Sequence, residues 1–98
     1  SAVYAANDLM AIGAIQAVLR SGRRVPEEIS IVGFDDIDLS SMIHPALTTV
    51  HQPRREMGRE SVRLLIERIE GVGPIKNLLL NPALLERGST AAKPRSSL

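Results

Sequence analysis

Short apolar runs, separated by polar and glycine-containing segments, predict a series of β-strands along the chain. The runs are rich in alanine, valine, isoleucine, leucine or threonine and carry few charges, as strands buried within a parallel sheet do. Five segments fit this description, the last two more weakly than the others: 2–6, 29–34, 47–51, 76–80 and 84–87.

Between these strands, apolar residues recur at the three- and four-residue spacing of amphipathic helices. One helix is predicted from Leu9 to Gly22, and a longer one from about Pro53 to Glu70. A short helix or loop is predicted over 37–45. Strand-helix-strand order with helices of this length predicts an α/β fold with parallel strands.

The composition describes a small globular protein without a strong charge of either sign. Of the 98 residues, 44% are hydrophobic and 23% charged, and 12 basic against 11 acidic side chains leave a net charge of +1. This balance provides no bulk field for nucleic acid or an anionic membrane, and no apolar stretch reaches the roughly 18 residues of a membrane helix. The absence of cysteine excludes disulfides and thiolate zinc sites.

Polar side chains follow the predicted strands. Asn7 and Asp8 come after the first strand, and Asp35 and Asp36 after the second. Ligands of open parallel sheets bind beyond the carboxyl ends of the strands, where an amide and a carboxylate suit vicinal hydroxyl groups. The alternative is that these residues are turn and capping residues. We assign Asp8 to the N-cap of the first helix and Asp36 to holding the loop. Asn7 and Asp35 stay open between the two roles.

The sequence offers no constellation for catalysis, metal binding or a cofactor. His44 and His51 lie in different predicted elements and have no metal ligands at matching spacing. Glycine-rich phosphate and dinucleotide loops and a Gly-x-Ser-x-Gly elbow are missing. Arginines of the 53–70 helix are interleaved with glutamates, as in the pair Glu60–Arg63, which predicts a solvated face rather than a nucleic-acid surface. We therefore expect neither an enzyme nor a bound cofactor.

Four segments in order resemble the lactose-repressor (LacI/GalR) family of transcriptional regulators. They are AVYAANDLMAIGA at 2–14, VPEEISIVGFDD at 25–36, PALTTVHQP at 45–53 with Met57-Gly58 following, and LLERGST at 84–90. The resemblance implies a three-layer α/β fold with a parallel sheet, as part of a periplasmic-binding-protein-like (type I) effector-binding domain. It further implies that residues 1–50 belong to the C-terminal lobe. Residues 51–90 would then form the crossover, a helix and closing strands, and 91–98 a flexible tail.

The same resemblance implies roles for individual residues. Asn7 and Asp35 would hydrogen-bond the effector from one lobe, and Gln52 would face the same cleft from the crossover between lobes. Apolar residues would contribute to a homodimer interface, with core packing as the alternative for them: Ile12, Met42 and Ile43.

These expectations add up to the effector-binding and dimerisation portion of a LacI-type regulator. A small molecule, a sugar or a nucleobase, would alter binding of operator DNA by an N-terminal helix-turn-helix that the 98 residues do not contain. We expect such a protein to be cytoplasmic, without a membrane partner. The alternative is a fragment of a periplasmic sugar-binding protein of a transport system, which shares the fold. The chain opens directly in a predicted strand without a basic leader, so we expect that Ser1 is not the natural start.

Overall fold

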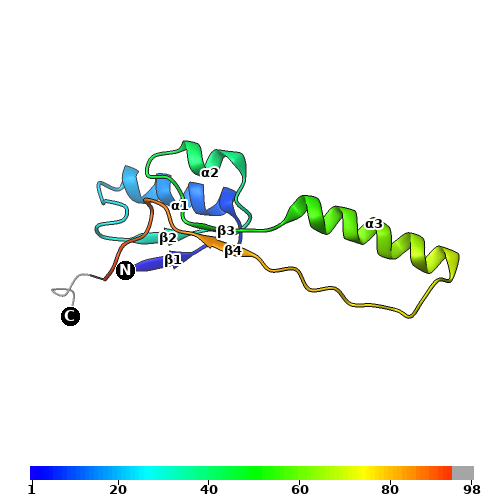
Figure 1. The fold of residues 1–98 in the computed structure, drawn as a ribbon. Helices are drawn as coiled ribbons and strands as arrows, with labels where there is room; N and C mark the ends of the chain where they lie inside the picture. Colours follow the sequence, from blue (N-terminus) through cyan, green and yellow to red (C-terminus); the bar gives the residue numbers. More distant parts are fainter. Residues whose placement is uncertain (94–98) are drawn as a thin grey trace. The chain divides into compact units, whose positions relative to one another are not determined.

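The computed structural model describes residues 1–93 and divides the chain into two compact units. The first unit consists of residues 1–51 together with the segment from residue 83 onward, and the second of residues 52–82. In chain order, the elements are β1 (Ala2–Tyr4), α1 (Asp8–Arg20), β2 (Ser30–Val32), α2 (Asp38–Met42), β3 (Thr49–His51), α3 (Arg54–Glu70) and β4 (Ala83–Leu85) (Figure 1).

The strands of the first unit confirm the predicted parallel pairing. β1 runs parallel to β2, with Val3 opposite Ile31, and parallel bridges from Val32 to Thr48 and from Asp35 to His51 place β3 beside the β2 segment. Because β1 is followed by α1 and β2 by α2, each connection returns the chain to the same end of the sheet, as parallel pairing requires. β4 then pairs with β3 in the antiparallel sense.

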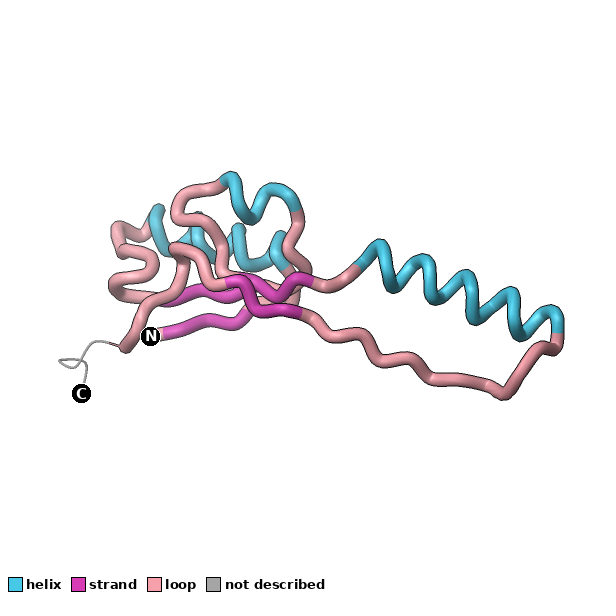
Figure 2. Tube along the Cα trace, in the orientation of Figure 1, coloured by secondary structure: helices cyan, strands magenta, loops and turns pink. Residues whose placement is uncertain are grey.

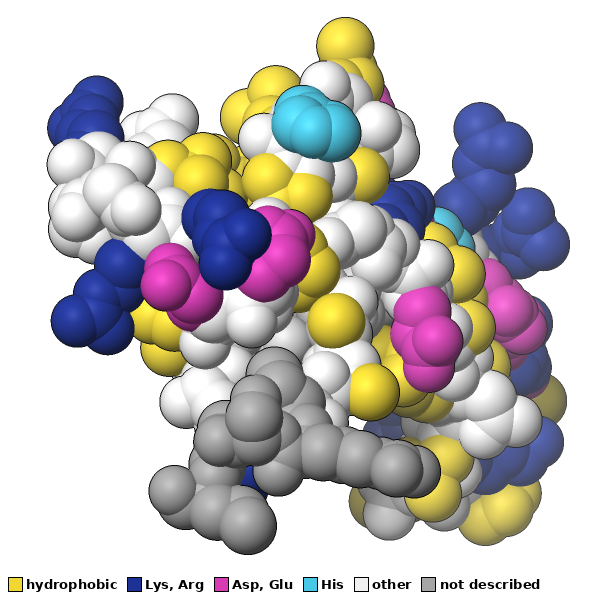
Figure 3. All heavy atoms as spheres, turned by 90° about the vertical axis from the view of Figure 1, so that its left-hand side faces the viewer, with side chains coloured by type: hydrophobic (Ala, Val, Ile, Leu, Met, Phe, Trp, Pro, Cys, Tyr) yellow, Lys and Arg dark blue, Asp and Glu magenta, His cyan; other side chains and the backbone are white. Residues whose placement is uncertain are grey.

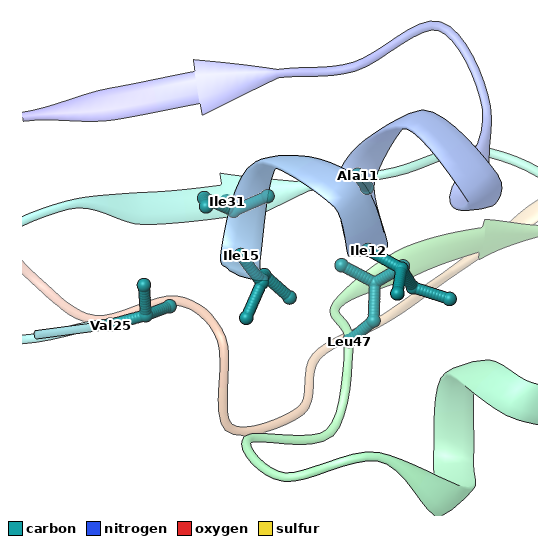
Figure 4. Close-up of a cluster of buried hydrophobic side chains, with 6 residues drawn as sticks. All are labelled: Ala11, Ile12, Ile15, Val25, Ile31 and Leu47. Carbon is teal, nitrogen blue, oxygen red and sulfur yellow. The ribbon is translucent and has the colours of Figure 1, made fainter. Parts of the chain in front are cut away.

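Helices α1 and α2 lie on the same side of these strands (Figure 1). The core forms between α1 and the sheet, where the apolar stripe of α1 meets side chains of β2 and the segment before β3 (Figure 4). The buried core residues are Ala11, Ile12, Ile15, Val25, Ile31 and Leu47. The first unit therefore contributes the sheet and one helical layer of the expected α/β fold.

The second unit consists of α3 and an extended segment. α3 ends at Gly71, whose φ of 68° is the left-handed conformation that glycine adopts at helix ends. None of the residues of α3 is buried, and its apolar stripe is exposed: Met57, Val62, Leu65, Ile66 and Ile69. Arg63 forms the predicted ion pair with Glu60 on this helix, and a second one with Glu67.

One prediction for the C-terminal part of the chain is wrong. Residues 76–80 form no strand but a loop (Figure 2), because the segment has no strand beside it with which to pair. Ala91, the first residue of the predicted tail, donates its N–H to Oγ of Ser30 at 3.1 Å. Residues 94–98 of that tail lie outside the described residues. Among the described helices, none is both long enough and apolar enough to cross a membrane.

Candidate functional site

Asn7, not Asp8, caps the first helix. The backbone of Asn7 is extended, and its Oδ1 accepts a hydrogen bond of 2.9 Å from the N–H of Met10. This is the geometry of an N-cap residue bonding the third helical residue. Asp8 is the first residue inside the helix, so the prediction that it caps the helix is wrong. Its side chain is available for a different task.

The Asp8 carboxylate is completely buried and accepts hydrogen bonds from three residues, two at the start of α2 and one in β3. Its Oδ2 accepts from the Ser40 hydroxyl at 2.5 Å and from the N–H of Ile37 at 3.0 Å, and its Oδ1 accepts from the Thr49 hydroxyl at 2.6 Å. Burial by itself raises the pKa of a carboxyl group, but here the hydrogen bonds outweigh it and lower the pKa of Asp8 below its ordinary value. Asp8 is therefore a buried anion held by neutral donors.

The turn after β2 contains two successive residues with positive φ, Asp35 at 132° and Asp36 at 60°. Aspartate tolerates such backbone conformations better than most residues, but each still costs about 1–3 kcal/mol and persists only where the surroundings fix it. The N–H of Asp35 donates to the carbonyl oxygen of Val50 at 3.0 Å, and the N–H of Asp36 to the Thr49 hydroxyl at 3.4 Å. The strain thus lies at the carboxyl end of a parallel strand, where ligands of such sheets bind.

The Asp36 carboxylate holds the turn from a second direction. It contacts Nδ1 of His51 at 2.8 Å through Oδ2 and accepts from the Arg87 guanidinium at 2.9 Å through Oδ1. Burial raises the pKa of Asp36, but the bonds to His51 and Arg87 prevail, and its pKa is lowered. The predicted loop-holding role of Asp36 is confirmed, and His51 has a structural partner.

Two of the three predicted ligand residues occupy the same end of one sheet. Asn7 follows β1 and Asp35 follows β2, and these strands are parallel neighbours. Both residues are partly exposed. The Asn7 oxygen serves as the helix cap, which leaves its amide N–H groups as donors. Gln52 is partly exposed and belongs to the second unit, where its carbonyl oxygen accepts from the N–H of Arg54.

The three predicted dimer residues have different surroundings. Ile12 is 9% exposed and packs with Leu47 in the core (Figure 4), which is the alternative left open for it. Ile43 is partly buried against the same core. Met42, at the end of α2, is 76% exposed. Of the three, Met42 has the side chain most available to a second subunit.

Sequence reasoning missed Asp8, and with it the hydroxyl groups of Ser40 and Thr49. The signal was present in the Asn7-Asp8 pair, because a helix has a single N-cap position and the second residue must find other partners. Arg87 was also missed, since its partner Asp36 lies far away in the sequence.

The described residues contain no cluster of three or more histidine, aspartate or glutamate side chains that could hold a metal ion. On the face shown in Figure 3, basic and acidic side chains lie interspersed rather than in regions of one sign. Open α/β folds bind small molecules beyond the carboxyl ends of their strands. Here that region contains a strained, well-anchored turn and the polar start of a helix. The fold and the arrangement of these residues are those of an α/β domain with parallel strands and polar residues at their carboxyl ends.

Comparison with known proteins specifies the family. The family model described as periplasmic binding protein-like domain matches residues 1–90, and the chain belongs to this family. It is 46% identical over 96 residues to the HTH-type transcriptional repressor CytR of Escherichia coli (strain K12), with 96% of this chain and 28% of that repressor covered. The chain therefore spans little more than a quarter of the length of this relative.

Solved structures agree with this assignment. The Lac repressor dimer bound to operator and the anti-inducer ONPF matches with a TM-score of 0.87 and 43% identity, over 93% of this chain and 32% of that one. The complex of the transcriptional regulator CelR with cellobiose matches with a TM-score of 0.85 and 44% identity, over 90% and 27% of the two chains. The expected α/β fold of the periplasmic-binding-protein type is confirmed.

Proposed function

We propose that the chain is the effector-binding and dimerisation portion of a LacI-type transcriptional regulator. A small molecule, a sugar or a nucleobase, binds beside Asn7 and Asp35 and alters operator binding by an N-terminal helix-turn-helix domain. The observation that carries the proposal is the strained Asp35–Asp36 turn next to Asn7 at one sheet end, in a chain that resembles regulators of this kind.

The chemistry of the two side chains suits a polyhydroxylated effector. A carboxylate accepts hydrogen bonds strongly, so Asp35 is suited to two hydroxyl groups or to the N–H groups of a base. Asn7 supplies donors to an oxygen of the same molecule. Gln52 offers one donor and one acceptor group, and we propose it as a further ligand residue.

Regulation requires that the effector favour one arrangement of the protein over another. A ligand shifts an equilibrium only by its difference in affinity for the two states. In the proposal, the crossover at residues 50–53 is the hinge, and Met42 and Ile43 contact the second subunit. The two helix-turn-helix domains of such a dimer bind the two half-sites of an operator. This function places the protein in the cytoplasm and requires no catalysis.

A periplasmic sugar-binding protein is the second candidate, because the family fold is shared with it. The similarity of the chain to proteins named as transcriptional repressors, over more than nine-tenths of its length, favours the regulator. Operator binding separates the two candidates, since a transport protein has no operator.

The test uses the full-length protein that contains these residues. A panel of ribose, cellobiose, cytidine and guanine is screened by calorimetry, and operator binding is followed by fluorescence anisotropy with and without each compound. We expect one compound to bind and to change operator affinity, and Asp35→Asn to weaken its binding at least about tenfold, as the loss of a charged hydrogen bond does. The matched control is Asp38→Asn, an exposed aspartate three residues away. A compound that binds without any effect on DNA affinity contradicts the regulator.

A further inference from the structure

The turn that carries Asp35 is held by its backbone amides. Three successive N–H groups, those of Asp35, Asp36 and Ile37, donate to three different acceptors. The first acceptor is a carbonyl oxygen of the neighbouring strand segment. The other two are side-chain atoms, the hydroxyl of Thr49 and the carboxylate of Asp8. Two of these three hydrogen bonds therefore depend on side-chain acceptors.

Both of these side chains belong to one network with Asp8 at its centre. The Thr49 hydroxyl has a single proton, which it donates to Oδ1 of Asp8 at 2.6 Å, so its lone pairs face the N–H of Asp36. Oδ2 of Asp8 accepts directly from the N–H of Ile37 at 3.0 Å. One carboxylate thus fixes the turn on both sides of Asp36, directly and through Thr49.

The position of Asp8 makes this anchoring rigid. It is the first residue of α1, it is completely buried, and the Ser40 hydroxyl ties it also to α2. Gly33 lies against it so closely that a Cβ atom there would overlap Oδ1 of Asp8. Gly33 thus bounds the carboxylate on one side, and the Ser40 and Thr49 hydroxyls hold it on others. Positive φ angles at two successive non-glycine residues persist only where the surroundings determine them in this way.

We propose that Asp8 is a positioning residue for the effector site: it holds the strained Asp35–Asp36 turn, through Ile37 and Thr49, in the conformation that presents the Asp35 carboxylate. This inference rests on the proposed function for its ligand, but the anchoring of the turn is a property of the ligand-free protein. Asp8 itself touches no effector. It also connects the site to α2, which ends at the exposed Met42 of the proposed subunit interface.

The experiment breaks the connection at Thr49 and leaves Asp8 in place. Thr49→Val has nearly the same volume as the parent side chain but removes the hydroxyl, and Thr49→Ser restores the hydroxyl. The matched control is Ser89→Ala, which also removes a fully buried hydroxyl that bridges two segments of the sheet, donating to the carbonyl of Ile31 and accepting from the N–H of Thr48. Ser89 has no bond to the turn among those described, so its loss reports the cost of a buried hydroxyl alone.

Two readouts are taken on the full-length protein. Hydrogen exchange in the absence of ligand is expected to be at least about tenfold faster at Asp36 and Ile37 in Thr49→Val than in Ser89→Ala, with parent-like exchange in Thr49→Ser. The affinity for whichever of ribose, cellobiose, cytidine and guanine binds the parent is expected to fall at least about tenfold in Thr49→Val alone. If the Thr49 hydroxyl has only a structural role, Thr49→Val and Ser89→Ala should both lose global stability but should not differ in exchange at Asp36 and Ile37 or in ligand affinity.

The outcomes separate the inference from the proposed function. If Thr49→Val exchanges at Asp36 and Ile37 as Ser89→Ala does, the connection from Asp8 through Thr49 does not hold the turn, and the inference, which requires that connection, is overturned whatever the ligand result. If exchange accelerates but the parent binds none of the four compounds, the proposed ligand class fails while the anchoring stands. If exchange accelerates and affinity is unchanged, the turn is anchored by Asp8 but does not present Asp35 to the effector, and the positioning role is overturned.

Discussion

Gly33 is the position where the addition of one methyl group has the largest effect that the structure predicts. It follows β2 directly and lies beneath α1. A Cβ atom at this position would overlap Oδ1 of Asp8 and would lie 3.0 Å from Cδ2 of Leu47 and 3.1 Å from Cβ of Ala11. All three neighbours belong to the buried part of the first unit, so Gly33→Ala forces α1 away from the sheet or turns the Asp8 carboxylate out of its bonds.

The magnitude follows from these two effects. Overpacking of a close-packed core costs about 1–3 kcal/mol. Loss of one hydrogen bond to a charged group costs a further 1.5–3 kcal/mol or so. If both effects occur, we expect Gly33→Ala to lower the free energy of unfolding by about 2.5–6 kcal/mol. This is a large part of the roughly 5–15 kcal/mol by which small domains are stable.

The assay is urea unfolding of the parent and the variant, followed by far-ultraviolet circular dichroism. The matched control is Gly13→Ala in the middle of α1, where a Cβ atom meets nothing within 4 Å. Alanine is a better helix former than glycine, so the control is expected to gain about 0.5–1 kcal/mol. If Gly33→Ala unfolds within 0.5 kcal/mol or so of the parent, the packing of α1 against Asp8 and Gly33 described above is refuted.

Three further predictions concern acidity, backbone strain and the subunit interface. Folding lowers the pKa values of Asp8 and Asp36, so their ionised forms stabilise the folded state. This contribution is fully present at pH values above about 3.9, the pKa of an aspartate in the unfolded chain. It is lost as the pH falls through the lower pKa values of the folded protein. Urea midpoints measured from pH 6 to 3 should fall, and Asp36→Asn should flatten that fall. Asp35→Gly and Asp35→Ala both remove the carboxylate, but only alanine retains a Cβ atom at a φ of 132°, so the glycine variant should be the more stable by about 1 kcal/mol in thermal unfolding. Equal stability of the two variants would mean that the turn is not strained. Met42→Glu introduces a charge at an exposed apolar position of the proposed interface. Sedimentation velocity of the full-length protein should then show a weakened dimer. Leu19→Glu, at an exposed position of α1, is the comparison variant.

The helices, which have a periodic apolar pattern, could be predicted from the sequence, but the absence of a strand at 76–80 could not. Helix α3 was expected from about Pro53 to Glu70 and is found at Arg54–Glu70, because its spacing, proline start and glycine end are local signals. The strand predicted at 76–80 rests on the three leucines at 78–80. Strand formation also needs a neighbouring strand for the backbone, which composition does not show. The segment is a loop for that reason.

The position of Asn7 and Asp35 at one end of the sheet was predictable, but the contacts that support this region were not. Polar residues after neighbouring parallel strands located Asn7 and Asp35 at one end of the sheet, which general rules for open sheets suffice to predict. The roles of Asp8 and Arg87 depend on partners 29 to 51 residues away, such as the Ile37 amide and the Asp36 carboxylate. No periodicity connects residues at such separations, and only the folded chain reveals that these side chains meet.

The pairing of β3 with β4 has a consequence for protein engineering. The chain leaves the first unit at the end of β3 and returns to it at the start of β4, after residues 52–82. His51, the last residue of β3, lies opposite Ala83, the first residue of β4. Paired strand ends of this kind are what a two-residue hairpin turn joins. Residues 52–82 can thus be regarded as an insertion in a hairpin, and a short Asn-Gly turn in their place would yield a miniature protein. That miniature would retain the α1 core, the buried Asp8 and the Asp35–Asp36 turn on a single continuous chain.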